Sequence, residues 1–272
     1  MLSGAVDPAE LVALAERVAR SAGALLLQRP TDLGVSTKSS PTDVVTVMDR
    51  ASERLLVDGL LEARPDDGIL GEEGGERSGA SGVRWLLDPI DGTVNYLYGL
   101  REWTVSVAAE ADGEVVAGVV HAPALGDTYA ATLGGGARWN GDPTGVGSAP
   151  ELAQTLLATG FGYDSAQRAR QAAVIAAVLP RVRDIRRIGA ASLDLCLLAA
   201  GRVDAYVEQG LQPWDLAAGG LIASEAGARV EGLRGAPAGE ALVIATRPEL
   251  FDALHSLLVG AGVDTLTTGG TS

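Results

Sequence analysis

The chain has 272 residues, of which 47% are hydrophobic, so it can bury a large core and does not belong to the disordered class. Its formal net charge of −14 argues against nucleic acid or an anionic membrane as a partner held by bulk attraction. No stretch approaches the roughly 18 apolar residues of a membrane span, and the start lacks the basic region of a signal peptide, so we expect a cytoplasmic protein.

The first predicted element is a helix. Asp7 and Pro8 have the residue types of an N-cap and a first-turn proline, and apolar residues recur at helical spacing over 11–26. The next segment, 32–46, mixes β-branched residues with turn formers and predicts a hairpin or loop. Its Lys38 is equally consistent with a solvated charge and with a site residue.

Helical spacing returns over 45–63, with Asp49 in the first turn, where a carboxylate suits the helix dipole. The segment 68–71 predicts a short strand that leads directly to Glu72 and Glu73. Adjacent glutamates in a glycine-rich loop are usually solvent-facing. We nevertheless treat them as candidate site residues, because the strand and the next carboxylates fall within about one βαβ-sized interval.

The stretch that carries the most chemistry begins with an apolar strand at 85–87. Pro89 has no N–H group for a ladder, so we predict that it ends the strand and that Asp88 and Asp91 project from its carboxyl end. Ligands of α/β sheets bind at that end of the strands. Residues 92–93 are predicted to open a short helix, whose free N–H groups suit a phosphate. Two carboxylates beside a phosphate imply a divalent cation between them, and magnesium fits an oxygen-only site better than zinc.

Antiparallel strands are predicted next, and Gly134 to Gly136 form a tight turn rather than a dinucleotide fingerprint. His121 and His255 have no further ligand at metal-binding spacing, so we expect both to be structural and predict no zinc site. The three predicted strands cover residues 103–109, 114–121 and 127–132.

Near Pro150 the pattern changes to alternating strands and helices, which predicts a partly parallel sheet covered by helices. We therefore divide the chain into an N-terminal α+β half, 1–149, and a C-terminal α/β half, 150–272. The predicted strands of the second half are 154–159, 185–188, 203–207 and 241–246, and the predicted helices are 165–179, 190–200, 213–226 and 248–259.

Three features of the second half need an interpretation. Cys196, the only cysteine, lies in an apolar run and is predicted to be a buried, inert thiol. The only basic cluster is interpreted as a solvated face or a subunit contact, because no aromatic residues interleave it as in nucleic-acid sites. Asp215 begins a helix opened by Pro213 and is either a dipole-complementing acid or a third site carboxylate. The cluster consists of Arg181, Arg183, Arg186 and Arg187.

Four ordered segments carry a resemblance to a known family. DPIDGT at 88–93 and PWDLAAG at 213–219 resemble the two signatures of the inositol monophosphatase family, and LGEE at 70–73 and KSSP at 38–41 are similar to two further family segments. The resemblance covers the chain from about Leu11 to about Leu258. It implies a lithium-sensitive, magnesium-dependent phosphomonoesterase with a layered αβαβα sandwich, a fold of the α/β class.

The resemblance also implies roles for particular residues. Thr93 is expected to donate to Asp49 so that the pair aligns a water, and Glu208 and Ala191 are expected to face the polyol. Lys38 is expected in a loop near the metals, with Glu73 supporting Glu72. A family loop that often contains proline matches the chain at Gly162, which leaves the rigidity of that loop open.

These expectations combine into a mechanism. One ion on Glu72, Asp88 and the Ile90 carbonyl would activate water, and a second ion between Asp88, Asp91 and Asp215 would stabilise the leaving alkoxide. A looser third ion would bind Glu72, so we expect two to three Mg²⁺ ions, with Mn²⁺ as a substitute and Li⁺ as an inhibitor. The N–H groups of Gly92 and Thr93, together with Asp215, would contact substrate.

The substrate class has several alternatives. The leading hypothesis is hydrolysis of myo-inositol monophosphate by a cytoplasmic homodimer. Related enzymes hydrolyse histidinol phosphate, fructose 1,6-bisphosphate or adenosine 3′,5′-bisphosphate, and few side chains separate these activities. A different class, a non-catalytic metal-binding regulatory protein on the same fold, would be favoured by loss of a ligand carboxylate, yet all are present.

Overall fold

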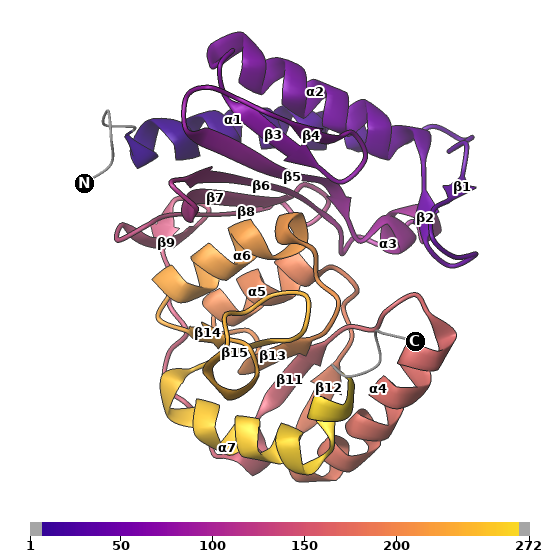
Figure 1. The fold of residues 1–272 in the computed structure, drawn as a ribbon, viewed down its shortest axis with the longest axis vertical. Helices are drawn as coiled ribbons and strands as arrows, with labels where there is room; N and C mark the ends of the chain where they lie inside the picture. The colour runs from indigo at the N-terminus through magenta and orange to yellow at the C-terminus, as the bar shows by residue number, and fades with distance from the viewer. Residues whose placement is uncertain (1–6, 267–272) are drawn as a thin grey trace.

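The computed structural model describes residues 7–266. These form five layers of alternating helices and sheets, with two helices on each outer side and two in the middle (Figure 1). Helices α1 (Pro8–Leu26) and α2 (Val47–Ala63) cover one face of an eight-stranded sheet. Helices α5 (Ala191–Ala199) and α6 (Pro213–Glu225) lie between this sheet and a five-stranded sheet, whose far side is covered by α4 (Ser165–Val178) and α7 (Pro248–Gly260). The predicted αβαβα sandwich is confirmed.

The eight-stranded sheet is antiparallel except for one parallel pair, β3 with β5, and its strand order is β10-β9-β8-β7-β6-β5-β3-β4. Its strands are β3 (Gly68–Gly71), β4 (Gly75–Arg77), β5 (Val83–Asp91), β6 (Thr104–Ala111), β7 (Glu114–Ala122), β8 (Asp127–Thr132), β9 (Gly136–Trp139) and β10 (Asp142–Pro143). The predicted hairpin of the N-terminal part is β1 (Ser36–Thr37) with β2 (Val44–Val45), and α3 (Thr93–Tyr98) follows β5.

The five-stranded sheet has the order β12-β11-β13-β15-β14. It is parallel between β11 and its two neighbours and antiparallel elsewhere, so the predicted partly parallel sheet is confirmed. Its strands are β11 (Leu156–Thr159), β12 (Asp184–Arg186), β13 (Ala205–Glu208), β14 (Arg229–Glu231) and β15 (Val243–Thr246).

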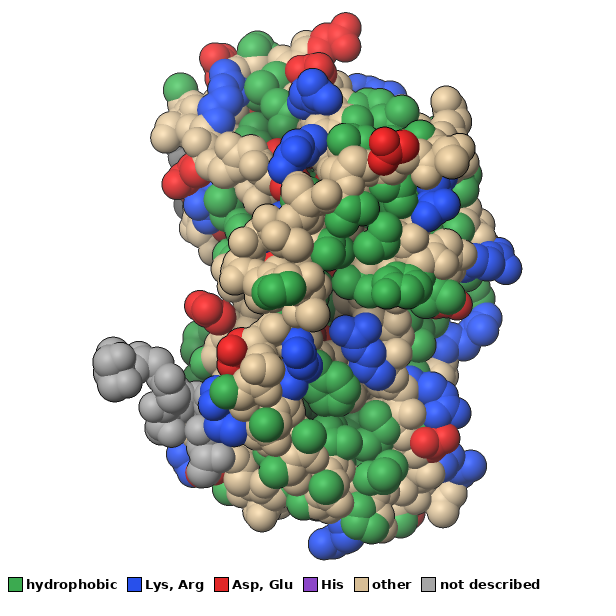
Figure 2. Space-filling view, turned by 90° about the vertical axis from the view of Figure 1, so that its right-hand side faces the viewer, with side chains coloured by type: hydrophobic (Ala, Val, Ile, Leu, Met, Phe, Trp, Pro, Cys, Tyr) green, Lys and Arg blue, Asp and Glu red, His purple; other side chains and the backbone are tan. Residues whose placement is uncertain are grey.

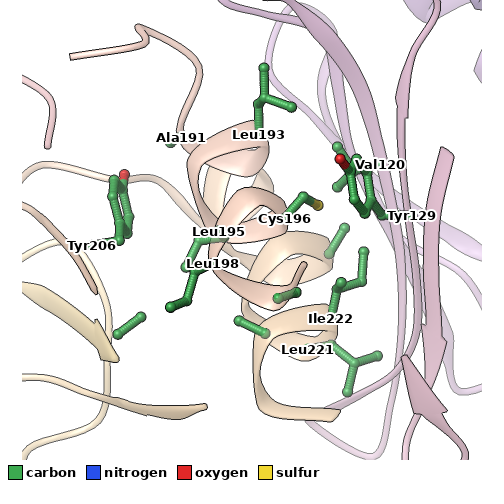
Figure 3. Packing of buried hydrophobic residues seen from close by; sticks show 14 of the residues in the cluster. Val120, Tyr129, Ala191, Leu193, Leu195, Cys196, Leu198, Tyr206, Leu221 and Ile222 are labelled. Atoms are coloured by element: carbon green, nitrogen blue, oxygen red, sulfur yellow. The ribbon is translucent and has the colours of Figure 1, made fainter. Parts of the chain in front are cut away.

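The middle helices are mostly apolar around their circumference, as expected for helices that both sheets cover, although α5 also buries Ser192 and Asp194. Figure 3 shows α5 with Leu193 and Cys196 between the eight-stranded sheet and the side of Tyr206, so Cys196 is buried as predicted. Helix α6 packs closely against β7, where a Cβ atom on Gly118 would lie 2.9 Å from the Cα atom of Ala218. Only glycine permits this separation between the helix and the strand.

Several sequence predictions about elements are wrong in detail. The predicted strands 154–159 and 185–188 are Leu156–Thr159 and Asp184–Arg186, because Gln154 belongs to a 3-10 turn and the pairing with β11 ends at Arg186. Pro89 does not end its strand, because β5 continues to Asp91 across an irregularity in its pairing with β6, and a residue without an N–H group is tolerated there. Helix α2 begins at Val47 rather than at residue 45, because Thr46 caps it and Val45 pairs in β2. Strands β4, β9, β10 and β14 were not predicted, and each has no more than four residues. No helix within residues 7–266 is long and apolar enough to cross a membrane.

Candidate functional site

A cleft of about 520 Å³ lies where the carboxyl end of β5 meets the starts of α4, α5 and α6. Figure 2 looks onto the side of the molecule on which α3 and α4 lie, and it shows a hollow between the upper and lower parts. Ten residues predicted from the sequence line the cleft: Lys38, Glu72, Asp88, Ile90, Asp91, Gly92, Thr93, Ala191, Glu208 and Asp215. The two other predicted residues, Asp49 and Glu73, contact this lining from behind.

The turn after Asp88 is fixed by its own carboxylate and by α2. The Asp88 Oδ1 atom accepts a hydrogen bond from the Ile90 N–H group at 3.0 Å. The Ser52 hydroxyl donates to the Pro89 carbonyl at 3.0 Å. These bonds give partners to the Ile90 N–H group and the Pro89 carbonyl, which lie where the pairing of β5 with β6 is irregular. Ile90 and Asp91 then line the cleft.

Asp91 is bound by the start of α5. Its carboxylate accepts hydrogen bonds from the N–H groups of Ala191 at 3.1 Å and Ser192 at 2.7 Å, and from the Ser192 hydroxyl at 2.5 Å. The first N–H groups of a helix have no partner within the helix, so a carboxylate from another element is a natural acceptor for them. The bond joins β5 of one sheet to a helix that lies 100 residues later in the chain.

Thr93 lies between two acceptors. Its hydroxyl is 3.0 Å from the Asp49 Oδ1 atom and 3.0 Å from the Ile90 carbonyl oxygen. Asp49 in turn accepts from the N–H group and the hydroxyl of Thr46, at 2.8 and 2.6 Å. The expected pairing of Asp49 with Thr93 is therefore present, and Asp49 also completes the cap of α2.

Lys38 forms ion pairs with both of the adjacent glutamates. Its ammonium group lies 2.8 Å from Glu72 Oε1 and also forms an ion pair with Glu73. Behind them, the buried Glu53 carboxylate accepts the Glu73 N–H group at 2.8 Å. Sequence reasoning missed Glu53, although Asp49, Ser52 and Glu53 recur at the i, i+3 and i+4 spacing of one helix face, a signal for a buried polar stripe.

The remaining predicted residues come from the second half of the chain. Asp215 lies in the first turn of α6, and its Oδ2 atom accepts the Gln212 N–H group at 2.7 Å. Glu208 ends β13 and accepts a hydrogen bond from the Tyr206 hydroxyl at 2.6 Å. A Cβ atom on Gly160 would lie 2.0 Å from the Glu208 carboxylate, so the glycine leaves room for that side chain.

The cleft is strongly acidic. Burial raises the pKa of Asp88 well above its ordinary value, and the charges of Glu72, Asp91 and Asp215 raise it further. Burial also raises the pKa of Asp215, with Asp91 adding to the effect. The pKa of Asp91 is raised less, because burial is opposed by the hydrogen bonds from Ser192 and its neighbours. Burial raises the pKa of Glu208 to about 7.

This set of donors fits a divalent cation in its chemistry. All of the groups are oxygen ligands, and burial and mutual repulsion, which raise the pKa values of Asp88 and Asp215, disfavour their ionised forms in a way that a bound cation would offset. Within residues 7–266, however, no three carboxylate, histidine or cysteine groups already surround one point as a closed cage. Asp91 and Asp215 each bind backbone N–H groups, and Glu72 binds Lys38, so an incoming ion would share these groups.

The structure corrects the interpretation of the basic cluster. Arg186 pairs with Asp184 at the surface, as expected for a solvated face, whereas Arg187 lines the cleft. Its position after β12 brings it beside the start of α5, which the spacing of the arginines alone did not reveal. Of the histidines, His121 is buried with its Nδ1 atom 2.9 Å from the Thr128 hydroxyl, and His255 accepts the Arg234 N–H group at 3.1 Å.

The fold and the cleft first define a class: layered α/β proteins with a carboxylate-lined cleft between two sheets. A model of the inositol monophosphatase family matches residues 7–261. The "Inositol-1-monophosphatase" of Mycobacterium leprae is 48% identical over 275 residues, which cover 93% of this chain and 94% of that protein. The chain therefore belongs to the inositol monophosphatase family, a family of phosphatases.

Two further relatives extend this result. The solved structure of the Thermotoga maritima IMPase matches with a TM-score of 0.86 at 33% identity, covering 94% of this chain and 99% of that one. A Pasteurella multocida protein named "Nus factor SuhB" is 39% identical over 222 residues, covering 80% of this chain and 83% of that protein. The family thus includes proteins that are named for enzymatic activity and proteins that are named as Nus factors.

Proposed function

We propose that the chain is a magnesium-dependent phosphomonoesterase that hydrolyses myo-inositol monophosphate to inositol and phosphate. The observation that carries the proposal is the meeting of Glu72, Asp88, Asp91 and Asp215 in one cleft with Glu208. The four carboxylates suit divalent cations and the phosphate that these bind, and Glu208 suits hydroxyl groups. The similarity to proteins named inositol-1-monophosphatase also supports this substrate.

In this proposal Glu72, Asp88 and the Ile90 carbonyl would hold one cation, and Asp88, Asp91 and Asp215 would hold another. Bound Mg²⁺ would acidify water and stabilise negative charge on the phosphoryl and leaving oxygens. A third, looser ion would bind Glu72, Mn²⁺ would substitute for Mg²⁺, and Li⁺ would inhibit. When a cation binds Glu72, Lys38 would give up its ion pair with this residue and would contact the edge of the site instead.

Thr93 and Asp49 would orient the attacking water. Because the Thr93 hydroxyl donates a hydrogen bond to Asp49 or to the Ile90 carbonyl, the lone pairs of its Oγ1 atom remain able to accept a hydrogen bond from water. Asp49 remains an acceptor, since three hydrogen bonds converge on its carboxylate. The water would then direct its own lone pair toward the phosphorus atom for in-line attack.

The substrate would be held at its two ends by different groups. The N–H groups of Gly92 and Thr93 would bind phosphate oxygens, and Glu208 and Ala191 would face the polyol, with Asp215 between the two ends. Glu208→Gln should therefore raise the KM for inositol 1-phosphate more than the inhibition constant for inorganic phosphate. Equal changes in the two constants would contradict this division of roles.

The test is phosphate release from inositol 1-phosphate, histidinol phosphate, fructose 1,6-bisphosphate and adenosine 3′,5′-bisphosphate. Each substrate is assayed with Mg²⁺, with Mn²⁺, with chelator and with Mg²⁺ plus Li⁺. We expect the highest kcat/KM for inositol 1-phosphate with Mg²⁺ and no turnover in chelator. A preference for any of the other three substrates would assign the chain to a related metabolite phosphatase.

A second candidate is a non-catalytic metal-binding regulator, which the relative named Nus factor SuhB favours. It is distinguished by magnesium raising the melting temperature without phosphate release from any of the four substrates. We further propose that the chain is a cytoplasmic homodimer. Sedimentation equilibrium would test the dimer, and the expected result is a single species of twice the 27.7 kDa chain mass.

A further inference from the structure

The loop from Gly160 to Asp164, between β11 and α4, forms one wall of the cleft. Side chains of α4 fix this loop. The Gly162 N–H group donates to the buried Gln171 Oε1 atom at 3.1 Å, and Arg168 donates to the Tyr163 carbonyl at 2.9 Å. Proline at position 162 has no N–H group and could not make the first of these bonds, so glycine here does not leave the wall loose.

Of the two aromatic residues in this wall, Phe161 is half-buried and Tyr163 is exposed. Its side chain is 43% exposed although it lines the cleft, and it takes part in none of the ring contacts found among the described residues. Burial raises the pKa of the Tyr163 phenol, and the charges of Asp43, Glu72 and Asp91, which line the same cleft, raise it further. Tyr163 therefore lies partly exposed in the cleft that these carboxylates share.

A contact across the mouth fixes the backbone of Tyr163 from the other side. The Thr42 hydroxyl donates to the Tyr163 carbonyl at 3.2 Å. Thr42 belongs to the same β1–β2 loop as Lys38, so the segment that pairs with Glu72 also touches the wall that carries the tyrosine. The backbone of Tyr163 is thus held by both halves of the chain, and 43% of the residue stays exposed.

We propose that Tyr163 determines specificity by packing its ring against the apolar C–H face of a cyclic polyol monophosphate, so that the cleft favours ring-shaped over open-chain leaving groups. The inference rests on the proposed function and narrows its substrate class. A cyclic polyol presents C–H groups above and below its ring, and these match the negative face of an aromatic side chain. An open-chain polyol has no comparable flat surface to cover the tyrosine.

The experiment compares inositol 1-phosphate with the open-chain glycerol 2-phosphate in wild type, Tyr163→Ala and Tyr163→Phe. Tyr163→Ala should lower kcat/KM for inositol 1-phosphate by about three- to tenfold, the size of one aromatic contact, mainly through KM. Turnover of glycerol 2-phosphate should stay within about twofold, and Tyr163→Phe should behave as wild type. The matched control is Tyr98→Ala, since Tyr98 is 77% exposed and does not line the cleft.

Each possible result of this experiment supports or contradicts the proposed role of Tyr163. A similar loss for both substrates in Tyr163→Ala would overturn it and assign the tyrosine a role in holding the loop. An equal loss in Tyr163→Phe would overturn ring packing in favour of a hydroxyl contact. If wild type hydrolyses neither ester with Mg²⁺, the proposed function fails together with the inference, whereas hydrolysis of both with unchanged selectivity in Tyr163→Ala removes the inference alone.

Discussion

Ser192 holds Asp91 by two groups at once, its backbone N–H group at 2.7 Å and its hydroxyl at 2.5 Å. The same hydroxyl lies 2.7 Å from the Thr104 hydroxyl on β6, so it bridges a strand of the first sheet and the first turn of α5. Both residues are buried. The carboxylate expected to carry a metal is therefore oriented by a serine that is not part of either family signature.

Ser192→Ala removes one charge-assisted hydrogen bond from Asp91 and leaves the Thr104 hydroxyl with one partner fewer. We expect a loss of about 1.5–3 kcal/mol in the free energy of unfolding, because hydrogen bonds to charged groups contribute that much. We also expect kcat to fall about tenfold, because Asp91 can rotate away from the cleft. Urea unfolding and steady-state kinetics measure the two effects, with the exposed Ser21→Ala as the control. Unchanged kcat in a destabilised Ser192→Ala protein would show that the orientation of Asp91 is not limiting.

Asp91→Asn and Asp215→Asn should each lower kcat at least about a hundredfold, because each removes charge from the site that stabilises the leaving oxygen. Far-ultraviolet circular dichroism should show that the fold survives, since the single oxygen of asparagine can still accept the Ser192 N–H group at position 91 and the Gln212 N–H group at position 215. The matched control is Asp58→Asn on the exposed side of α2. Near-normal turnover in either site variant would contradict the proposed mechanism.

Magnesium should raise the melting temperature by relieving repulsion around Asp88. A ligand that binds only the folded chain adds about 2.7 kcal/mol at one hundred times its Kd, which corresponds to a rise of about 5–10 °C for a chain of this size. Asp88→Asn should melt higher than wild type in chelator, because it removes one of the carboxylates that raise one another's pKa. It should also gain less from added magnesium. A full magnesium response in Asp88→Asn would show that this carboxylate is not a ligand.

Glu208 should make stability fall as the pH rises. Its pKa is raised from 4.5 to about 7, chiefly by burial, so the folded chain binds more protons than the unfolded chain between these values. Ionising the carboxylate above pH 7 therefore costs stability that is present below pH 4.5. Glu208→Gln should melt higher than wild type at pH 8, and the difference should shrink at pH 5.5. Melting curves in chelator measure this, and a constant difference between the two pH values would assign the effect to packing.

Much of the site could be predicted from the sequence because its chemical groups lie in short local patterns. Asp88 and Asp91 follow a buried strand, and Asp215 follows a first-turn proline, so spacing and residue type place them at strand and helix ends. The side chains that support the site were harder to predict. Ser192 binds Asp91 from 101 residues later in the chain, and no local pattern indicates this contact. Glu53 binds the Glu73 N–H group, and its only signal is its helical spacing with Asp49 and Ser52. The division of the chain near residue 150 stays a prediction.

The structure also contains a polar group that no sequence pattern indicates. Asp194 is 1% exposed on α5, and neither carboxylate oxygen has a hydrogen-bond partner among the described residues. Burial raises its pKa well above the ordinary value, and the charge of Glu208 raises it further. Both sheets cover α5, so the sequence of this helix alone does not show whether Asp194 faces the core or the cleft.

Gly118 lies outside the cleft, but its close approach to Ala218 affects the width of the cleft. Helix α6 begins with the turn that carries Asp215, and its distance from the sheet that carries Asp88 and Asp91 is set where the helix backbone rests on β7. A single methyl group at position 118 would push α6 away from β7. The spacing between the carboxylates of the two halves would widen with it, although no residue of the cleft had changed.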